Sequence, residues 1–201
     1  MKGTIMRHGN RKSWSVALTF DDGPQDPYTD QILDILAKYS IKATFFLRGE
    51  KAEQNPDIVR RIVSDGHEIG NHSYSHKTMR SRSLKWLRNE IERTDELLMQ
   101  AGASQPIHFR PPFGRTSFQL ISLLKKMKKK MILWDIGPKD FKYAHPYEIV
   151  GKVLKKLKPG SIIVLHDGGG DRSVTVDALN ILVKDIREMG YKFVTISELT
   201  D

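Results

Sequence analysis

Short apolar runs alternate with amphipathic stretches along almost the whole chain. The apolar runs have the length and composition of buried strands and cover residues 14–20, 42–47, 67–71, 107–110, 131–136, 161–166 and 192–196. Between them, apolar residues recur at helical spacing within residues 32–39, 58–66, 84–102, 118–127, 146–158 and 179–190. Strands that alternate with helices form βαβ units, so the pattern predicts a parallel sheet.

Polar side chains recur where the predicted strands end. Strand by strand, these residues are Asp21 with Asp22, His72 with His76, Arg110, Asp140 and His166. The loops that follow the strands of a barrel converge on one mouth, which favours a TIM-like barrel. A dinucleotide-binding sheet is disfavoured, because no Gly-x-Gly-x-x-Gly follows the first strand. We therefore expect an α/β fold of about seven parallel strands, in a single domain of residues 14–201 after a basic N-terminal segment of residues 1–13.

The first of these sites is the segment Thr19 to Pro24, which follows an apolar run and ends in a Gly-Pro turn signal. Neighbouring side chains of a strand point to opposite faces, so we expect Asp21 and Asp22 to have different roles. A metal ligand beside a proton acceptor fits such a pair. The alternative is an aspartate pair that caps a turn or the next helix.

His72 and His76 are four residues apart, and in a helical turn this spacing would put both rings on one face. With Asp21 or Asp22 they would form a set of two histidines and one carboxylate. Such a set leaves a coordination position open for water or substrate, as catalytic sites do. Zinc fits these ligands, and other divalent ions, including non-haem iron, fit them too. The alternative is two surface or capping histidines without a metal.

Two further residues stand at strand ends beside strong turn signals. Arg110 precedes two prolines and could orient one of the aspartates and keep it ionised, although a structural ion pair is the alternative. His166 ends the sixth predicted strand and could serve as a general acid. A nearby carboxylate would raise its pKa, and either Asp140 or Asp167 could supply that carboxylate.

Composition narrows the class of protein. The chain has 201 residues and no cysteine, which excludes disulfides and thiolate chemistry. Its net charge is +9, but the lysines interleave with apolar residues at helical spacing, which indicates solvated helix faces. No nucleic-acid-binding module accompanies them, so we expect no nucleic-acid partner; attraction to an anionic surface such as a cell wall is a secondary interpretation. No segment has the pattern of a signal peptide or transmembrane helix, so we expect a soluble protein. We also expect it to be a monomer.

Five segments together resemble the ordered motifs of the polysaccharide deacetylase family, which is the NodB-homology group or carbohydrate esterase family 4. They are Thr19 to Pro24, His72 to His76, Arg110 to Gly114, Trp134 to Phe141 and Leu165 to Asp167. The resemblance extends over nearly the whole chain. It implies a distorted (β/α) barrel that removes acetyl groups from N-acetylated sugars.

The resemblance also implies a role for each motif residue. The implied catalytic residues are Asp21 as general base, Arg110 as its orienting partner, Phe113 as the backbone donor to the oxyanion, and His166 as general acid tuned by Asp140. The implied metal ligands are Asp22, His72 and His76, and zinc is the expected ion, with cobalt or another divalent ion as alternatives. The implied substrate pocket includes Leu165 for the acetyl methyl group, together with Phe141 and Pro112.

The fourth motif departs from the family pattern of Asp-x-x-Asp-Trp, because this chain has Gly137 and Phe141 at its first and last positions. We interpret the change as an altered pocket wall that affects substrate preference. The resulting hypothesis is a metal-dependent N-deacetylase of N-acetylglucosamine polymers, such as peptidoglycan or chitin oligomers, at the cell envelope or outside the cell. A catalytically weak carbohydrate-binding domain is the alternative. An iron oxygenase with the same ligand set is disfavoured by the alternation of strands and helices.

Overall fold

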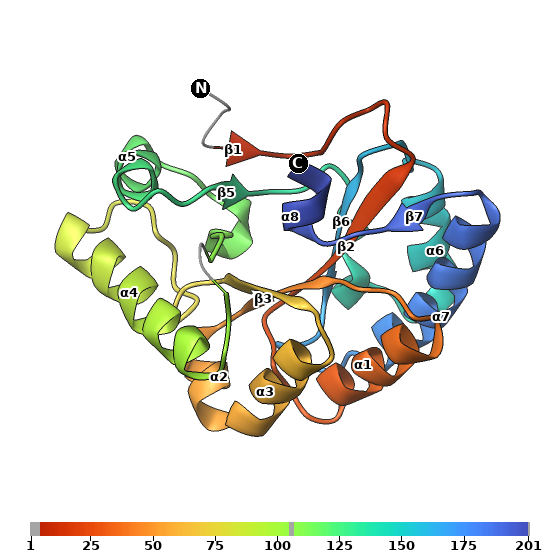
Figure 1. Ribbon diagram of the computed structural model, residues 1–201, viewed down its shortest axis with the longest axis horizontal. Helices are drawn as coiled ribbons and strands as arrows, with labels where there is room; N and C mark the ends of the chain where they lie inside the picture. Colours follow the sequence, from red (N-terminus) through yellow and green to blue (C-terminus); the bar gives the residue numbers. More distant parts are fainter. Residues whose placement is uncertain (1–4, 105–106, 201) are drawn as a thin grey trace.

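Strand β2 (Ser15–Asp21) lies at the centre of the sheet because its residues are buried on both faces. It pairs in parallel with β3 (Thr44–Leu47) and with β6 (Ile162–His166), and β3 pairs in parallel with β4 (Glu68–Asn71). The short strand β7 (Lys192–Phe193) pairs with the start of β2. Figure 1 shows this sheet in the computed structural model, which describes residues 5–104 and 107–200.

The remaining strand pairings are short. β1 (Ile5–Met6) pairs in parallel with β5 (Met131–Ile132). The strand predicted at residues 107–110 is reduced to single bridges from Phe109 to Asn71 and Met131, and Ile136 makes one bridge to Ile163. These bridges carry the parallel pairing from β4 towards β6 without continuous ladders. The fold is therefore an α/β fold with the pairing of a distorted barrel, as predicted.

Helices fill the intervals between strands, as the hydrophobic pattern predicts. They are α1 (Tyr28–Lys38), α2 (Gly49–Gln54), α3 (Pro56–Ser64), α4 (Leu84–Gln100), α5 (Phe118–Lys126), α6 (Pro146–Leu154), α7 (Ser173–Glu188) and α8 (Ile196–Thr200). The 3₁₀ turns η1 (Pro112–Gly114) and η2 (Asp140–Lys142) lie in loops. In the described part of the chain, every helix is too short or too polar to cross a membrane.

Three clusters of buried apolar side chains hold these elements together, and the smallest joins β2, β3, β5 and β6 to α8. The largest cluster joins the strands β2, β3 and β6 to α1, α3, α6 and α7. A second cluster joins α4 and α5 to Phe109 and Met131. Figure 1 shows α4 and α5 at one end of the molecule and α6 and α7 at the other.

Three findings differ from the sequence predictions. A strand, β1, lies inside the segment of residues 1–13, and Arg11 forms an ion pair with Asp135 at 2.7 Å, so the described part of this segment, residues 5–13, packs on the domain. The short helices α2 and α8 were not predicted. Lys129, assigned to a solvated helix face, is buried and pairs with Asp95 at 2.8 Å, because α5 ends at Lys126 and the chain then turns inward.

Candidate active site

The carboxyl ends of the central strands meet at one edge of the sheet. Asp21, the last residue of β2, is the register partner of His166, the last residue of β6. His72 directly follows β4, which lies two strands from β2 on the other side. Because the strands are parallel, the polar residues that end them come together here, as the sequence predicted.

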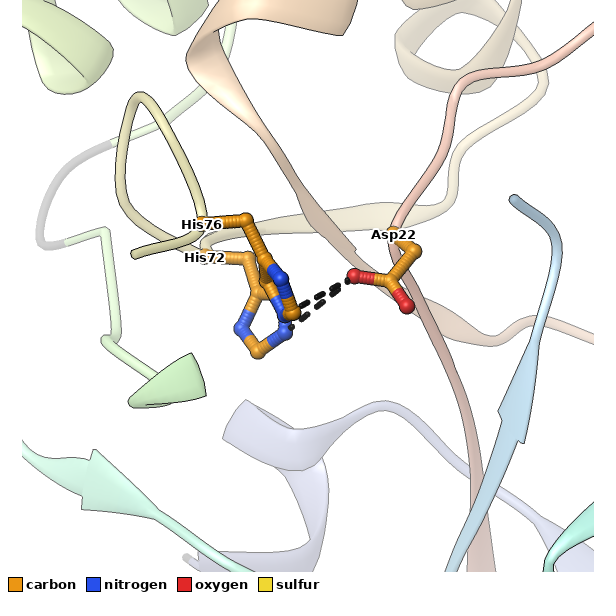
Figure 2. A group of neighbouring side chains, drawn as sticks. All are labelled: Asp22, His72 and His76. Atoms are coloured by element: carbon orange, nitrogen blue, oxygen red, sulfur yellow. Dashed lines mark ion pairs between the residues drawn. The ribbon is translucent and has the colours of Figure 1, made fainter. Parts of the chain in front are cut away.

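Asp22, His72 and His76 form a compact cluster whose candidate ligand atoms all lie within 4.8 Å of one another. Asp22 Oδ1 is 3.1 Å from Nε2 of His76 and 3.7 Å from Nε2 of His72. Figure 2 shows the two imidazole rings side by side and facing the carboxylate. Asp22, rather than Asp21, is therefore the carboxylate that completes this set.

The protonation of the cluster suits a cation. Nδ1 of His72 donates to the carbonyl oxygen of Arg110 at 2.8 Å, since a carbonyl can only accept. Burial lowers the pKa of His72 to about 3, so the ring is neutral and Nε2 presents a lone pair towards Asp22. Asp22 Oδ1 is buried and has no hydrogen-bond partner among the described residues. A buried carboxylate oxygen without a partner is costly, and a metal ion would satisfy it.

The two histidines are not on a helical turn, which corrects the sequence prediction. Residues 72–76 form a loop, and the rings meet because Ser73 and His76 have left-handed backbones, with φ of 65° and 54°. Asp22 is also left-handed, with φ of 78°. Such conformations are uncommon for residues other than glycine and cluster at functional sites.

Asp21 is held by Arg110, which is fully buried. Nη1 of Arg110 donates to Oδ1 of Asp21 at 2.6 Å and to Oγ1 of Thr19 at 2.7 Å. The guanidinium also lies over the ring of Phe46, 3.9 Å from its centroid. Burial raises the pKa of Asp21 above its ordinary value, and the charge of Arg110 opposes that rise. The result is a fixed carboxylate with greater basicity than an exposed aspartate.

His166 is paired with Asp140, which settles the choice left open by the sequence. Nδ1 of His166 lies 2.8 Å from Oδ1 of Asp140, and the backbone N–H of His166 donates to Oδ2 at 2.9 Å. Burial alone would lower the pKa of His166, but the hydrogen bond and charge of Asp140, together with the charges of Asp21 and Asp22, outweigh burial and raise the pKa. An imidazole held in its protonated form can donate a proton to a leaving group.

Asp167, the other candidate partner of His166, supports the loop after β2 instead. It accepts hydrogen bonds from the backbone N–H of Gly23 at 3.0 Å and from the hydroxyl of Thr29 at 2.8 Å. A Cβ at Gly23 would lie only 2.0 Å from Asp167 Oδ2, so glycine is required for this close approach. Burial, together with the charge of Asp22, raises the pKa of Asp167 to about 7.

These groups open into one cavity of about 450 Å³. It is lined by Asp21, Asp22, His72, His76, Phe113, Trp134, Gly137, Lys139, Phe141, Val164, His166 and Arg172. The structure thus brings the predicted metal ligands, base and acid together, with Arg110 and Asp140 directly behind them. The phenyl ring of Phe141 packs edge-on against the imidazole of His166, with 5.3 Å between ring centroids.

Two pocket predictions are wrong. Leu165 is fully buried in the largest apolar cluster, and Val164 lines the cavity instead. The reason is that side chains alternate along β6, so that Val164 and His166 share one face and Leu165 points to the other. Pro112 is buried behind the cavity wall, whereas the neighbouring Phe113 lines it.

Phe113 has a left-handed backbone with φ of 59°, unusual for an aromatic residue. Its ring packs edge-on against His76, with 4.7 Å between centroids. Three further lining residues, Trp134, Lys139 and Arg172, were not predicted as site residues. The three residues come from different parts of the chain, and the fold brings them to one cavity. For Trp134 and Lys139 the sequence does contain a signal, because both lie inside the fourth motif.

Comparison with known proteins identifies the family. The family model described as polysaccharide deacetylase matches residues 8–132. The chain is 39% identical over 186 residues to a peptidoglycan-N-acetylglucosamine deacetylase of Bacillus cereus, covering 92% of this chain and 87% of the relative. This chain belongs to the polysaccharide deacetylase family.

Solved structures of polysaccharide deacetylases extend the similarity to the whole fold. The Bc1960 peptidoglycan N-acetylglucosamine deacetylase superposes with a TM-score of 0.96 at 36% identity, covering 99% of this chain and 94% of the other. BA3943 of Bacillus anthracis, described as a pseudoenzyme of carbohydrate esterase family 4, superposes with a TM-score of 0.90 at 30% identity, covering 98% and 69%. Membership of the family therefore does not by itself establish catalysis.

The departure from the polysaccharide deacetylase pattern at Gly137 has a structural correlate. A Cβ at Gly137 would lie 2.6 Å from Nε1 of Trp134, and one at Gly114 would lie 2.8 Å from the same indole ring. The indole fills the space between the two glycines. With this position of Trp134, a side chain at residue 137 does not fit.

Proposed function

We propose that this polysaccharide deacetylase is a metal-dependent N-deacetylase that hydrolyses the acetamide of N-acetylglucosamine residues in peptidoglycan. The proposal rests on one observation above all. The cluster of Asp22, His72 and His76 shares a single cavity with the Asp21–Arg110 pair and the His166–Asp140 pair. A cation site, a fixed base and a charged acid are the three components that amide hydrolysis by water requires.

The donor set supports a divalent metal, with zinc as the first candidate. Asp22, His72 and His76 would hold it, since they offer two neutral imidazole nitrogens and a carboxylate oxygen. When bound, a divalent ion supplies Lewis acidity to the scissile carbonyl and makes the attacking water more acidic. The neutral state of His72 and the unpartnered oxygen of Asp22 are the features of this chain that fit such an ion.

The proposed reaction uses Asp21 and His166 on opposite sides of the amide. Asp21 accepts a proton from water as the water oxygen bonds to the carbonyl carbon. The backbone N–H of Phe113 would stabilise the negative oxygen that forms. His166 then donates a proton to the amide nitrogen as the C–N bond breaks, which yields acetate and a free amino sugar. Arg110 keeps Asp21 oriented, and Asp140 keeps His166 charged.

The substrate is proposed from two sources. The Bacillus cereus relative and Bc1960 act, by their names, on N-acetylglucosamine in peptidoglycan. The walls of the cavity combine apolar surface from Trp134, Phe141 and Val164 with polar groups, which suits a sugar ring that carries an acetyl group. We propose peptidoglycan as the first substrate to test and chitin oligomers as the second, with the monomeric enzyme acting at the cell envelope.

Acetate release tests this function directly. Release would be measured from peptidoglycan and from N-acetylglucosamine oligomers, after chelation and again after zinc or cobalt is added back. We expect chelation to abolish release and metal to restore it. Asp21→Asn should lower kcat by about 10²–10⁴-fold with metal still bound, whereas His76→Ala should lose the metal. Turnover at the native rate by Asp21→Asn would remove Asp21 from the mechanism, and Asp26→Asn, at an exposed neighbouring aspartate, is the control.

A carbohydrate-binding protein without activity is the second candidate, because the similar BA3943 is described as a pseudoenzyme. That outcome predicts binding to glycans and to metal with no acetate released from either substrate. The arrangement of Asp21, Arg110, His166 and Asp140 supports the enzyme instead.

A further inference from the structure

Helix α4 is hydrogen-bonded to the loop that carries the two histidines. Glu90 is on the buried face of this helix, with 5% of its surface exposed. Its Oε2 accepts a hydrogen bond from the backbone N–H of Ser75 at 2.9 Å, and the Ser75 hydroxyl lies 2.9 Å from both carboxylate oxygens. Among the described residues, each side-chain hydrogen bond of Glu90 goes to Ser75, the residue immediately before His76.

The two histidines are anchored differently. The ring of His72 is fixed by the hydrogen bond from its Nδ1 to the carbonyl of Arg110. The ring of His76 contacts Asp22 and the rings of His72 and Phe113, and within residues 5–104 and 107–200 its nitrogens meet no backbone carbonyl. The place of the His76 ring therefore depends on where the backbone of residue 76 is held.

That backbone is in the left-handed region, with φ of 54° at His76 and 65° at Ser73. Such conformations persist where the surroundings over-determine them. The hydroxyl of Ser73 accepts from the N–H of His76 at 3.2 Å, a long hydrogen bond that acts within the loop itself. From outside the loop, the backbone N–H groups of Gly49 and Glu50 donate to the carbonyl oxygens of Ser73 and Tyr74. Glu90 holds the next residue, Ser75, and displacement of Ser75 would leave the buried carboxylate of Glu90 without partners, at a high cost.

The start of the loop has a separate anchor. Asp95, one turn beyond Glu90 on α4, accepts a hydrogen bond from Nδ2 of Asn71 at 2.8 Å and pairs with Lys129 at 2.8 Å. Oδ1 of Asn71 accepts from the N–H of Ser73 at 2.8 Å. Asp95 thus holds the end nearer His72, Gly49 and Glu50 hold the middle of the loop, and Glu90 holds the residue next to His76.

We propose that Glu90 is a positioning residue for the metal centre. By fixing Ser75, Glu90 keeps His76 close enough to Asp22 and His72 for the three side chains to bind one metal ion. This inference rests on the metal assignment of the proposed function. It predicts that the loss of Glu90 weakens metal binding more than it weakens folding. Residues that orient metal ligands typically change metal affinity by about 10–100-fold when removed.

The test measures metal affinity and ligand geometry in the full chain. Cobalt and zinc affinities of the wild type, Glu90→Ala and Glu90→Gln would be measured by competition with a chromogenic chelator, and the cobalt absorption spectrum recorded for each. We expect Glu90→Ala to lower affinity about 10–100-fold and to change the cobalt spectrum. Glu90→Gln should recover much of the affinity, because its amide oxygen can still accept from Ser75. Circular dichroism at the same temperature would show that each variant is folded.

The control is Glu92→Gln, which removes a charge from the same helix at a half-buried position that pairs with Arg88 and does not contact the histidine loop. It should leave both the affinity and the spectrum unchanged. If folded Glu90→Ala binds cobalt with unchanged affinity and spectrum, Glu90 is structural and the inference is wrong. If Glu90→Ala does not fold, Glu90→Asp decides, since it keeps the charge but is one methylene too short to hold both the N–H and the hydroxyl of Ser75; unchanged metal affinity and spectrum of Glu90→Asp would overturn the inference. Failure of the wild type to bind metal would overturn the proposed function itself, and this inference with it.

Discussion

At the residue scale, the site contains a carboxylate and an imidazole whose protonation states must differ. Asp21 has to be ionised to accept a proton, and His166 has to be protonated to donate one. Burial raises the pKa of Asp21, while Asp140 raises the pKa of His166 despite burial. There is a pH interval in which Asp21 is ionised and His166 is protonated. Because both pKa values are raised, this interval lies at higher pH. The proposed activity therefore has an acid limb set by Asp21 and an alkaline limb set by His166.

Asp140→Asn tests the alkaline limb. The pKa of His166 is raised by the hydrogen bond and charge of Asp140, so removal of that charge should lower it. His166 would then lose its proton at lower pH, and the alkaline limb of kcat should move to lower pH, with kcat reduced by about 10²–10⁴-fold at the wild-type optimum. Asp177→Asn, at an exposed residue of α7, is the control. An alkaline limb at the same pH in Asp140→Asn would mean that another group sets it.

The chemical residues could be predicted from the sequence because each one directly follows an apolar strand or lies within a turn signal. The choice between Asp140 and Asp167 could not, since both are close to His166 in the folded chain and only the geometry separates them. Leu165 was assigned to the pocket although strand alternation places Val164 on the face of His166. Strand alternation in the sequence is therefore enough to favour Val164 over Leu165.

At the scale of elements, long periodic segments were predicted well and short ones were not. The strand at residues 107–110 has the right composition, but two prolines follow it, and proline cannot donate to a ladder, so only single bridges form. The loop of residues 72–76 could not be predicted, because the hydrogen bonds that hold its backbone come from residues distant in the sequence, from Glu90 on α4 and from Gly49 and Glu50 at the start of α2. Its two histidines meet through tertiary contacts rather than through helical spacing.

The contact between the loops after β2 and β6 leads to a prediction about stability. Asp167 joins these loops through Gly23 and Thr29, and its pKa is raised to about 7, largely by burial. The unfolded chain ionises this group near its ordinary pKa of about 4. Asp167 therefore contributes stability that is fully present below about pH 4 and is lost as pH rises through about 7. Its contribution falls by at most about 1.4 kcal/mol per pH unit in this interval.

Asp167→Asn should remove that pH dependence, because an amide stays neutral in both states. The free energy of unfolding would be measured by urea titration between pH 4 and pH 8 in the presence of chelator. We expect the wild type to lose stability relative to Asp167→Asn as pH rises, since other groups affect both proteins equally. Parallel curves for the two proteins would show that Asp167 ionises normally in the folded chain. Asp26→Asn, at an exposed residue, should follow the wild type.

At the scale of the whole molecule, two groups of exposed lysines are separated from the cavity. The catalytic aspartates lie inside the cavity, while exposed lysines gather on and after α5, at Lys125, Lys126 and Lys128, and on and after α6, at Lys152, Lys155, Lys156 and Lys158. Figure 1 shows these two helices at opposite ends of the molecule. These lysines contribute to the net charge of +9 from outside the cavity, where they can act on the encounter with a large anionic substrate.

This separation predicts that salt affects the polymer and the oligomer differently. Attraction between exposed charges is screened when the Debye length falls from about 10 Å at 0.1 M salt to about 3 Å at 1 M. Binding to intact cell-wall sacculi, which carry anionic polymers, should weaken over this range, as measured by co-sedimentation. Acetate release from short neutral oligomers should change little. The triple variant Lys125→Glu, Lys126→Glu, Lys128→Glu should sediment less with sacculi at low salt and keep its turnover on oligomers, whereas the three Lys→Arg changes at the same positions should keep both. If salt lowered sacculus binding and oligomer turnover to the same degree, the lysines would have no separate role in binding to the wall. The same surface would then control both steps.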